Sequence, residues 1–201
     1  MKKIAVIFSS RHGSAQKYAA WISEELEADL FDKANVTQSQ ISDYDTVVYG
    51  GGLYAGSISG IEFITKNKPG KLIVFTVSLA NPATTDFSAV LKKNFDPALL
   101  NDVKVFHFRF RGGIDYKKIS TVHKIMMAMI KYYTLFTLRK KTPEEYTDDE
   151  RLFFEAYGNK IDFADPLTIK PLVDYVRGTQ MVNVRYTNFI EPQSGTSFQG
   201  L

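Results

Sequence analysis

A run of small polar, basic and glycine residues follows the first apolar stretch of the chain. Ser9 through Ala15 read SSRHGSA, with no large apolar side chain among them. A loop of this kind before a helix leaves the first helical N–H groups without intrahelical partners, and with the helix dipole behind them these groups suit a phosphate. The same residues also fit an ordinary turn in which Ser14 caps the helix.

Two further segments follow apolar runs in the same way. The sequence from Gly50 to Gly56 is GGGLYAG, and its glycines permit close approach of the backbone to a ligand. Ser78 through Asn81, SLAN, form the second short segment. Whether the three segments form one site depends on where the predicted strands and helices place them.

Alternating strands and helices are predicted to position the three segments. Apolar or β-branched runs predict five strands, at Ile4–Phe8, Ala28–Phe31, Thr46–Tyr49, Lys71–Val77 and Val103–Phe110. Helical spacing between them predicts helices after Ser14, through Ile61–Ile64 and over Asp86–Phe95. This alternation favours an α/β fold with a doubly wound, five-stranded parallel sheet, in which ligands bind beyond the carboxyl ends of the strands. The loops after strands one, three and four meet at that edge.

One long helix goes beyond this alternation. After a predicted glycine turn at Arg111–Tyr116, helical spacing predicts an extra helix over Ile119–Leu138. Most of its apolar residues form one face, namely Val122, Ile125, Met126, Met129, Ile130, Tyr133 and Phe136. Others lie outside that face, namely Met127, Tyr132, Leu135 and Leu138. Downstream, Thr147 is predicted to cap an acidic helix, and Pro166–Arg177 to form the last helix.

Charge is unevenly distributed along the 201 residues, although the net charge is only +3. Residues 117–141 contain seven Lys or Arg and no acid, whereas residues 142–165 contain eight acids. The basic helix has three interpretations: a core helix with solvated lysines, a docking face for a redox partner, or an interfacial helix attracted to anionic lipid. Nucleic-acid binding is not expected, because no recognition motif accompanies the basic residues.

Several classes of protein are excluded by what the sequence lacks. It has no cysteine, which rules out disulfides and cysteine nucleophiles, and its three scattered histidines predict no metal site. The sequence contains no GxxxxGK[ST], no GxGxxG after the first strand and no GxSxG. No apolar stretch approaches the length of a membrane span, and the apolar start is too short for a signal peptide. We therefore expect a cytoplasmic protein. The alternative is a cytoplasmic protein that associates with a membrane through residues 117–141.

The first loop, the GGGLYAG segment and the five strand–helix units resemble the flavodoxin family over most of the chain. Within it, the sequence is most similar to the branch that contains the menaquinone-dependent protoporphyrinogen oxidase, because of GGIDY, the Met-rich helix and Asn159–Asp165. The resemblance implies a bound FMN, with its phosphate on the first loop and its isoalloxazine between the loops after strands three and four. The family's phosphate loop is usually Thr-x-Thr-Gly-x-Thr, and here His12 and Ala15 replace two of its hydroxyl residues.

The resemblance also implies which residues contact the flavin. Tyr54 is expected to stack on one face of the ring, and the family's second stacking aromatic is absent, which leaves the other face open to substrate. No catalytic residue is assigned. The expected cofactor contacts are Ser9, Ser10, Arg11, His12, Gly13, Ser14, Ala15, Gly51, Gly52, Leu53, Tyr54, Ala55, Gly56, Ser78, Leu79, Ala80 and Asn81.

These expectations define three candidate functions. The first is an FMN-dependent oxidoreductase that passes electrons from a reduced substrate, such as a porphyrinogen, to a quinone. The alternative is a flavodoxin-type electron carrier serving a protein partner, although such carriers are typically strongly acidic and this chain has a pI near 8.9. The third is a flavin-free interaction module, motivated by the altered phosphate loop.

The domain organisation follows from the same pattern. We expect one flavodoxin-like domain at residues 1–178 and a C-terminal extension at 179–201 that is partly ordered at best. Within the extension, only Met181–Tyr186 alternates as a strand would. The sequence does not determine an oligomeric state.

Overall fold

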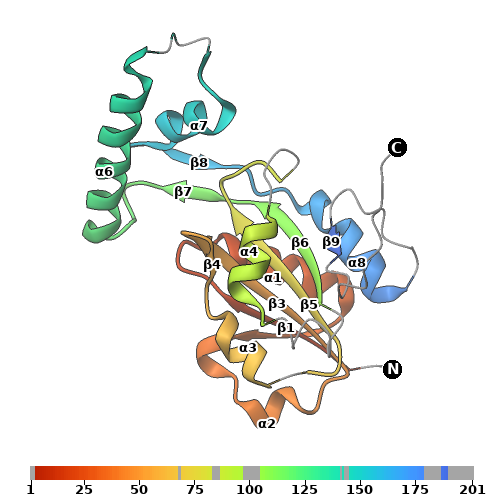
Figure 1. Ribbon diagram of the computed structural model, residues 1–201. Coiled ribbons are helices and arrows are strands. Elements are labelled where there is room, and N and C mark those ends of the chain that lie inside the picture. The colour runs from red at the N-terminus through yellow and green to blue at the C-terminus, as the bar shows by residue number, and fades with distance from the viewer. Residues whose placement is uncertain are drawn as a thin grey trace.

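The centre of the molecule is a sheet of parallel strands (Figure 1). The structure is a computed structural model that describes residues 3–67, 69–82, 87–96, 105–140, 142, 145–178 and 187–189. Five strands lie in the order β2-β1-β3-β5-β6 and pair in parallel. They are β1 (Ile4–Ser9), β2 (Asp29–Asp32), β3 (Thr46–Tyr54), β5 (Leu72–Ser78) and β6 (Val105–Arg111). The order runs outward in both directions from β1 and β3, so the predicted doubly wound sheet is confirmed.

Helices cover both faces of this sheet. Side chains of α1 (Ser14–Leu26) and α8 (Lys170–Arg177) share one buried cluster with the sheet, and α2 (Gln38–Ile41), α3 (Ile61–Asn67) and α4 (Ser88–Asn94) contribute to the cluster on the other face. A strand covered on both faces reads as a continuous apolar run, which is why Ile4–Phe8 was recognisable in the sequence.

Two short strands extend the sheet beyond the predicted five. Strand β9 (Thr187–Phe189) pairs antiparallel with β6, and β4 (Ser57–Ile58) folds back on the end of β3. The strand expected at Met181–Tyr186 lies outside the described residues, as does most of the expected extension.

The glycines after Tyr49 lie in a strand, so the prediction that β3 ends there is wrong. Gly50, Gly51 and Gly52 pair with β5 in register. A Cβ built on Gly50 would lie 1.9 Å from Cζ of Phe75, a fully buried ring, so glycine is required there by packing across the sheet. The loop begins only beyond Tyr54.

The segment between β6 and α8 leaves the sheet and returns to the helices that cover it. We call Gly113–Asp162 the insert. Its two ends pair as an antiparallel ribbon, so the turn predicted at Arg111–Tyr116 is wrong. Figure 1 shows the insert projecting away from the sheet. It comprises β7 (Gly113–Asp115), α6 (Thr121–Thr137), the 3₁₀ turn η2 (Leu138–Lys140), α7 (Asp148–Ala156) and β8 (Lys160–Asp162).

Helix α6 presents its apolar face to solvent. Exposed fractions reach 74% at Val122, 68% at Met129 and 66% at Phe136, and all seven residues of the predicted apolar face are exposed. The side that faces the protein carries half-buried Met127 and is followed by buried Leu138. The interpretation of this segment as a core helix is therefore wrong.

The remaining helices agree with the sequence-based prediction, except that the last predicted helix is divided into two elements. Thr147 caps α7, accepting a hydrogen bond from the backbone N–H of Glu150, as predicted. The last helix is split into a 3₁₀ turn, η4 (Pro166–Ile169), and α8. Pro171 explains the division, because it lacks an N–H and is tolerated only in the first turn of an α-helix. A short 3₁₀ turn, η1 (Lys33–Asn35), follows β2.

Candidate functional site

A cleft of about 230 Å³ opens at the carboxyl ends of β1, β3 and β5. All three segments singled out in the sequence contribute to it, together with the start of the insert and the first half of α6. It is lined by Ser10, His12, Ser14, Ala15, Gly52, Leu53, Tyr54, Val77, Ser78, Leu79, Gly112, Gly113, Ile114, Ile119, His123, Met126 and Met127.

The loop after β1 prepares the N-terminus of α1 for an anion. Gly13 occupies the N-cap position with φ +86°, a left-handed conformation that favours glycine, and no side chain caps the helix. Its N–H donates to Ser10 Oγ at 3.0 Å. The first intrahelical bond runs from Lys17 N to Gly13 O, so the N–H groups of residues 14–16 precede it. Such uncapped N–H groups at the positive end of a helix dipole bind oxyanions.

Ser14 joins the insert to this loop and does not cap α1. Its Oγ accepts a hydrogen bond from Gly113 N at 3.1 Å, and the N–H of Gly112 donates to Ser78 O at 2.7 Å. A Cβ on Gly112 would lie 3.0 Å from the Cβ of Ser14, so the chain leaving β6 passes directly against the loop after β1. The interpretation in which Ser14 merely caps the helix is wrong.

Tyr54 is the last residue of β3, directly before the tight turn into β4. Ala55 and Gly56 have φ values of +46° and +76°, as a type I′ turn requires. Asn94 Nδ2 donates to Gly56 O at 2.7 Å and fixes the turn to α4. The Tyr54 ring lies against Gly52, where a Cβ would be only 2.9 Å from it. Burial raises the pKa of the Tyr54 hydroxyl, so it stays protonated at neutral pH.

Three rings from distant parts of the sequence meet beside this hairpin. The ring centroid of His12 lies 5.8 Å from that of Tyr54 and 5.9 Å from that of His123 on α6. The guanidinium of Arg11 lies 5.0 Å from the centroid of the Tyr54 ring. Burial, and then the charges of His123 and Arg11, lower the pKa of His12. Because that pKa starts from 6.5, the His12 ring is mostly neutral at pH 7.

Of the seventeen residues predicted for the site, nine line the cleft. Arg11 and Gly13 lie beside it, as described above. Ser9 Oγ contacts Ser59 Oγ at 3.0 Å, Ala80 packs against the core, and Asn81 lines a separate cavity of about 340 Å³. The other residues that do not line the cleft are Gly51, Ala55 and Gly56.

Sequence reasoning missed the residues that the insert brings to the cleft. The sequence contains GGIDY and the Met-rich helix, but no local pattern shows that Ile114, Ile119 and His123 line the same cleft as the loop after β1. The hydroxyl of Ser120 was the available signal, because Ser is a preferred N-cap and thus fixes where α6 begins. Within the described residues, no group of three metal-ligating side chains gathers here or elsewhere.

Fold and cleft together define a class: doubly wound α/β proteins that bind a ligand at the carboxyl edge of a parallel sheet. The family model described as flavodoxin domain matches residues 5–135, which is more than half of the chain. The chain therefore belongs to the flavodoxin family. No curated protein matches the sequence.

The solved structures that the chain matches are distant in sequence. A flavodoxin from the domain Archaea is 12% identical, with a TM-score of 0.40 over 77% of this chain and 96% of that one. General stress protein 14 from Treponema denticola, solved in complex with FMN, is 12% identical, with a TM-score of 0.42 over 55% and 86%. Flavodoxin 2 from Bacillus cereus is 14% identical, with a TM-score of 0.41 over 54% and 84%. Similarities at this level carry no argument about the fold or the function of the chain.

Proposed function

We propose that the cleft binds FMN, with the phosphate on the loop after β1. The observation that carries this proposal is the uncapped N-terminus of α1 behind a left-handed Gly13. Backbone N–H groups supply most of such an anion site, so the replacement of two hydroxyl residues by His12 and Ala15 leaves it intact. Ser10 and Ser14 retain hydroxyls in the cleft lining.

The proposed ring position lies between Tyr54 and the end of β5. Tyr54 supplies a flat stacking surface, and Ser78 with Leu79 lines the opposite edge. The cleft volume of about 230 Å³ is below the ~300–1,000 Å³ usual for ligand sites.

We further propose that the protein is an oxidoreductase, with a reduced substrate such as a porphyrinogen as donor and a quinone as acceptor. The similarity of GGIDY, the Met-rich helix and Asn159–Asp165 to the menaquinone-dependent protoporphyrinogen oxidase branch supports this assignment. Bound FMN supplies the electron-transfer chemistry, and the protein binds, orients and shields it. Ile119, Met126 and Met127 give the cleft the apolar wall that an apolar substrate requires.

Two measurements test this function in sequence. Purified protein should carry flavin, seen as absorbance near 450 nm that is released on denaturation. The loaded protein should then oxidise protoporphyrinogen with a menaquinone analogue as acceptor. A protein that binds no FMN would be a flavin-free interaction module. FMN-loaded protein that does not turn over the substrates would refute the enzymatic assignment but not FMN binding.

The second candidate function is a flavodoxin-type electron carrier for a protein partner, which family membership favours. A carrier exchanges electrons with a reductase and needs no small-molecule substrate. Rapid reduction by a flavodoxin reductase, together with failure to turn over either small molecule, would select this function.

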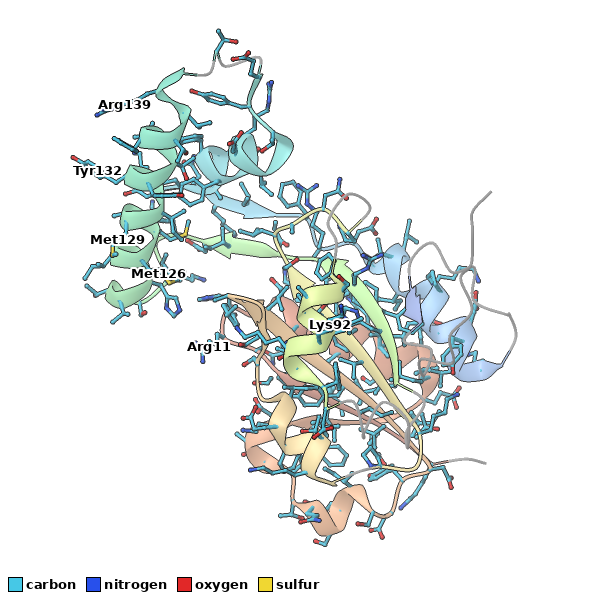
Figure 2. The ribbon with its side chains drawn as sticks, in the orientation of Figure 1. Arg11, Lys92, Met126, Met129, Tyr132 and Arg139 are labelled. Atoms are coloured by element: carbon cyan, nitrogen blue, oxygen red, sulfur yellow. The ribbon has the colours of Figure 1, made fainter. Side chains whose placement is uncertain are left out.

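We propose that residues 1–178 act as the FMN-binding domain and 179–201 as an extension of it, in the cytoplasm at a membrane surface. Contact with the membrane would be made through residues 117–141. Nine of the eleven large apolar side chains that are exposed in the described residues lie on α6. Figure 2 shows Met129 and Tyr132 extending from α6 away from the sheet. No helix among the described residues combines the length and apolarity needed to cross a bilayer, so the contact would be peripheral.

Charge favours lipid over a second copy as the partner of this face. Residues 117–139 include Lys117, Lys118, Lys124, Lys131 and Arg139 and no acid, so two such helices packed together would repel each other. A helix with an apolar face and flanking cations is typical of binding to anionic lipid surfaces.

Vesicle sedimentation tests this contact. Wild-type protein should bind vesicles of phosphatidylcholine with 30% phosphatidylglycerol, bind more weakly at high salt, and bind little to phosphatidylcholine alone. Met129→Glu should weaken binding at least tenfold, because burying such a side chain contributes about 1.5–3 kcal/mol. Leu167→Glu is the matched control, since Leu167 is 82% exposed on η4. Salt-independent retention, or a dimer that Met129→Glu dissociates, would refute the lipid contact.

A further inference from the structure

A second cavity, of about 340 Å³, opens where the carboxyl end of β6 meets η4 and α8. Its lining comes from these three elements, from Tyr18 on α1, from Phe163 directly after the insert, and from Asn81 and Pro82 after β5. None of the described residues that line this cavity also lines the cleft proposed for FMN. Its volume lies within the ~300–1,000 Å³ usual for ligand sites, so it can hold a ligand of its own.

The floor of the cavity is flat and apolar. The rings of Tyr18 and Phe110 stack with their centroids 4.6 Å apart and their planes 15° apart, and both residues are buried, as is Phe108. The rim is formed by Leu167, which is 82% exposed, and by exposed Pro171. An apolar group can therefore enter from solvent and contact aromatic faces.

The hydroxyl groups of the lining are already engaged within the protein. The hydroxyl of Tyr18 donates to Arg111 O at 2.8 Å and accepts from the N–H of Asp165 at 3.2 Å. Thr168 Oγ1 donates to Asp165 O at 2.6 Å, and the Asp165 carboxylate accepts from the N–H of Leu167. None of the described residues that line the cavity is Asp or Glu, whereas two arginines of β6 contribute to it. The lining thus favours a ligand group that accepts hydrogen bonds and carries negative charge.

The guanidinium group of Arg111 is held in a fixed orientation. Its Cζ lies 3.8 Å from the centroid of the Phe163 ring, and its Nε donates to Leu79 O at 3.1 Å. The N–H of Phe163 donates to Gly112 O at 3.3 Å, so the ring beneath the guanidinium is positioned as well. Among the described residues, none accepts a hydrogen bond from the two Nη atoms of Arg111. These two atoms are the end of the group that a carboxylate can bridge with two parallel hydrogen bonds.

We propose that this cavity is a second binding site, for a small carboxylate with an apolar body, and that the Nη atoms of Arg111 hold the carboxylate. The apolar walls favour such a ligand over free phosphate, which has no apolar surface to bury. The inference goes beyond the proposed function, because the site lies outside the cleft and requires no flavin. The two sites are neighbours across the loop after β5, since Arg111 bonds the carbonyl of Leu79 and Leu79 lines the cleft.

Three probes test the charge and the apolar body separately. The acid 3-phenylpropanoate, its neutral amide 3-phenylpropanamide, and acetate are titrated into the ¹⁵N-labelled full-length protein, with and without saturating FMN, and amide shifts are followed by NMR. The acid should bind at least tenfold more tightly than the amide, because hydrogen bonds to a charged group are stronger than neutral ones. It should also bind at least tenfold more tightly than acetate, which lacks the apolar body. The largest shifts should fall on residues 108–111 and 163–168.

Variants of Arg111 test the group that holds the carboxylate. Arg111→Gln should remove the preference for the acid over the amide. Arg111→Lys should keep part of it, because lysine retains the charge but not the two-pronged geometry. Thermal melts establish that each variant is folded.

A pair at Leu167 tests the charge of the cavity without altering its interior. Leu167→Glu should weaken binding of the acid at least threefold relative to Leu167→Gln, because it places a like charge at the rim. Leu30→Glu adds the same charge on β2, at the other edge of the parallel strands, where Leu30 is 42% exposed, and should leave the affinity unchanged. Since Leu167 is exposed, this pair decides the matter even where an Arg111 variant fails to fold.

Four results would overturn the proposal. They are equal affinities for acid and amide, a preference that survives Arg111→Gln, equal effects of Leu167→Glu and Leu30→Glu, and displacement of the acid by an equal concentration of inorganic phosphate. Release of the acid by FMN would place the probe in the cleft and would also refute the second site. Protein that binds no FMN but still prefers the acid would refute the proposed function and support this inference.

Discussion

Gly13 provides the most direct test of the phosphate site. A side chain would fit the space around it, but the backbone conformation of Gly13 is strained for any residue with a Cβ. A Cβ built there meets nothing within 4 Å, so a side chain has room. Its φ of +86° is nevertheless strained for any residue with a Cβ, at a cost of about 1–2 kcal/mol. Gly13→Ala therefore has to bear this strain or rotate the N–H groups of α1 away from the ligand.

The expected consequence is a weaker FMN site in a protein that still folds. A cost of about 1–2 kcal/mol corresponds to roughly a 5- to 30-fold lower affinity. Flavin fluorescence is quenched in many flavin sites, so a titration that follows it measures the dissociation constant. Gly13→Asn is the matched control, because Asn occupies left-handed conformations more readily than Ala, and it should lose less affinity. Gly13→Val should bind worst of the three.

The ordering of these variants is the decisive result. If Gly13→Val retained FMN at wild-type affinity, the phosphate would not lie on this loop. If Ala and Asn variants lost affinity equally, side-chain bulk rather than backbone strain would be responsible, which contradicts the empty space around the built Cβ.

Three further changes test the fold around the site. Gly50→Ala should lower the free energy of unfolding by about 1–3 kcal/mol, measured by urea denaturation, because its Cβ collides with the buried Phe75 ring. Tyr49→Phe should cost about 1 kcal/mol, since it removes a 2.7 Å hydrogen bond to Ser59 O. Burial, and then the charge of Arg109, lower the pKa of His107 to about 3, so stability should fall as pH decreases from 6.5 toward 3.

Two of these changes, at Gly50 and His107, have a control that isolates the cause. Shrinking the facing ring, in Gly50→Ala with Phe75→Leu, should recover part of the lost stability, and purely additive effects would refute the collision. For His107 the unfolded chain binds a proton below pH 6.5 that the folded chain binds only near pH 3, so His107→Gln should flatten the acid side of the stability profile. An unchanged profile would show that other groups control it.

The parts of the fold that can be predicted from the sequence are those determined by residues close together in the chain. Ile4–Phe8 and the loop after it combine a buried-strand run with a helix start, and both are visible within a few neighbouring residues. The glycines at 50–52 are typical of a loop in the sequence, because their partners, Phe75–Val77, lie in another strand and only the sheet brings them together.

The errors in the insert have the same origin. Strands β7 and β8 are three residues long and separated by more than forty residues, so neither has a pattern of its own. The apolar face of α6 was visible, but periodicity shows only that a helix is two-sided, not which side meets the protein. His123 lies beside His12 because the ribbon places α6 near the loop after β1. This placement depends on residues far apart in the chain, so no local spacing predicts it.

The ribbon formed by β7 and β8 also separates the insert from the rest of the domain. Because Gly113 pairs with Asp162 and Asp115 with Lys160, the chain leaves β6 and returns toward η4 and α8 through adjacent residues. Lys17 Nζ bonds Asp162 Oδ2 at 2.6 Å and ties the returning strand to α1. None of the central strands lies between Asp115 and Lys160, so their order does not depend on the insert. Entry to and exit from the insert thus lie side by side next to the cleft, which Gly112 and Gly113 line.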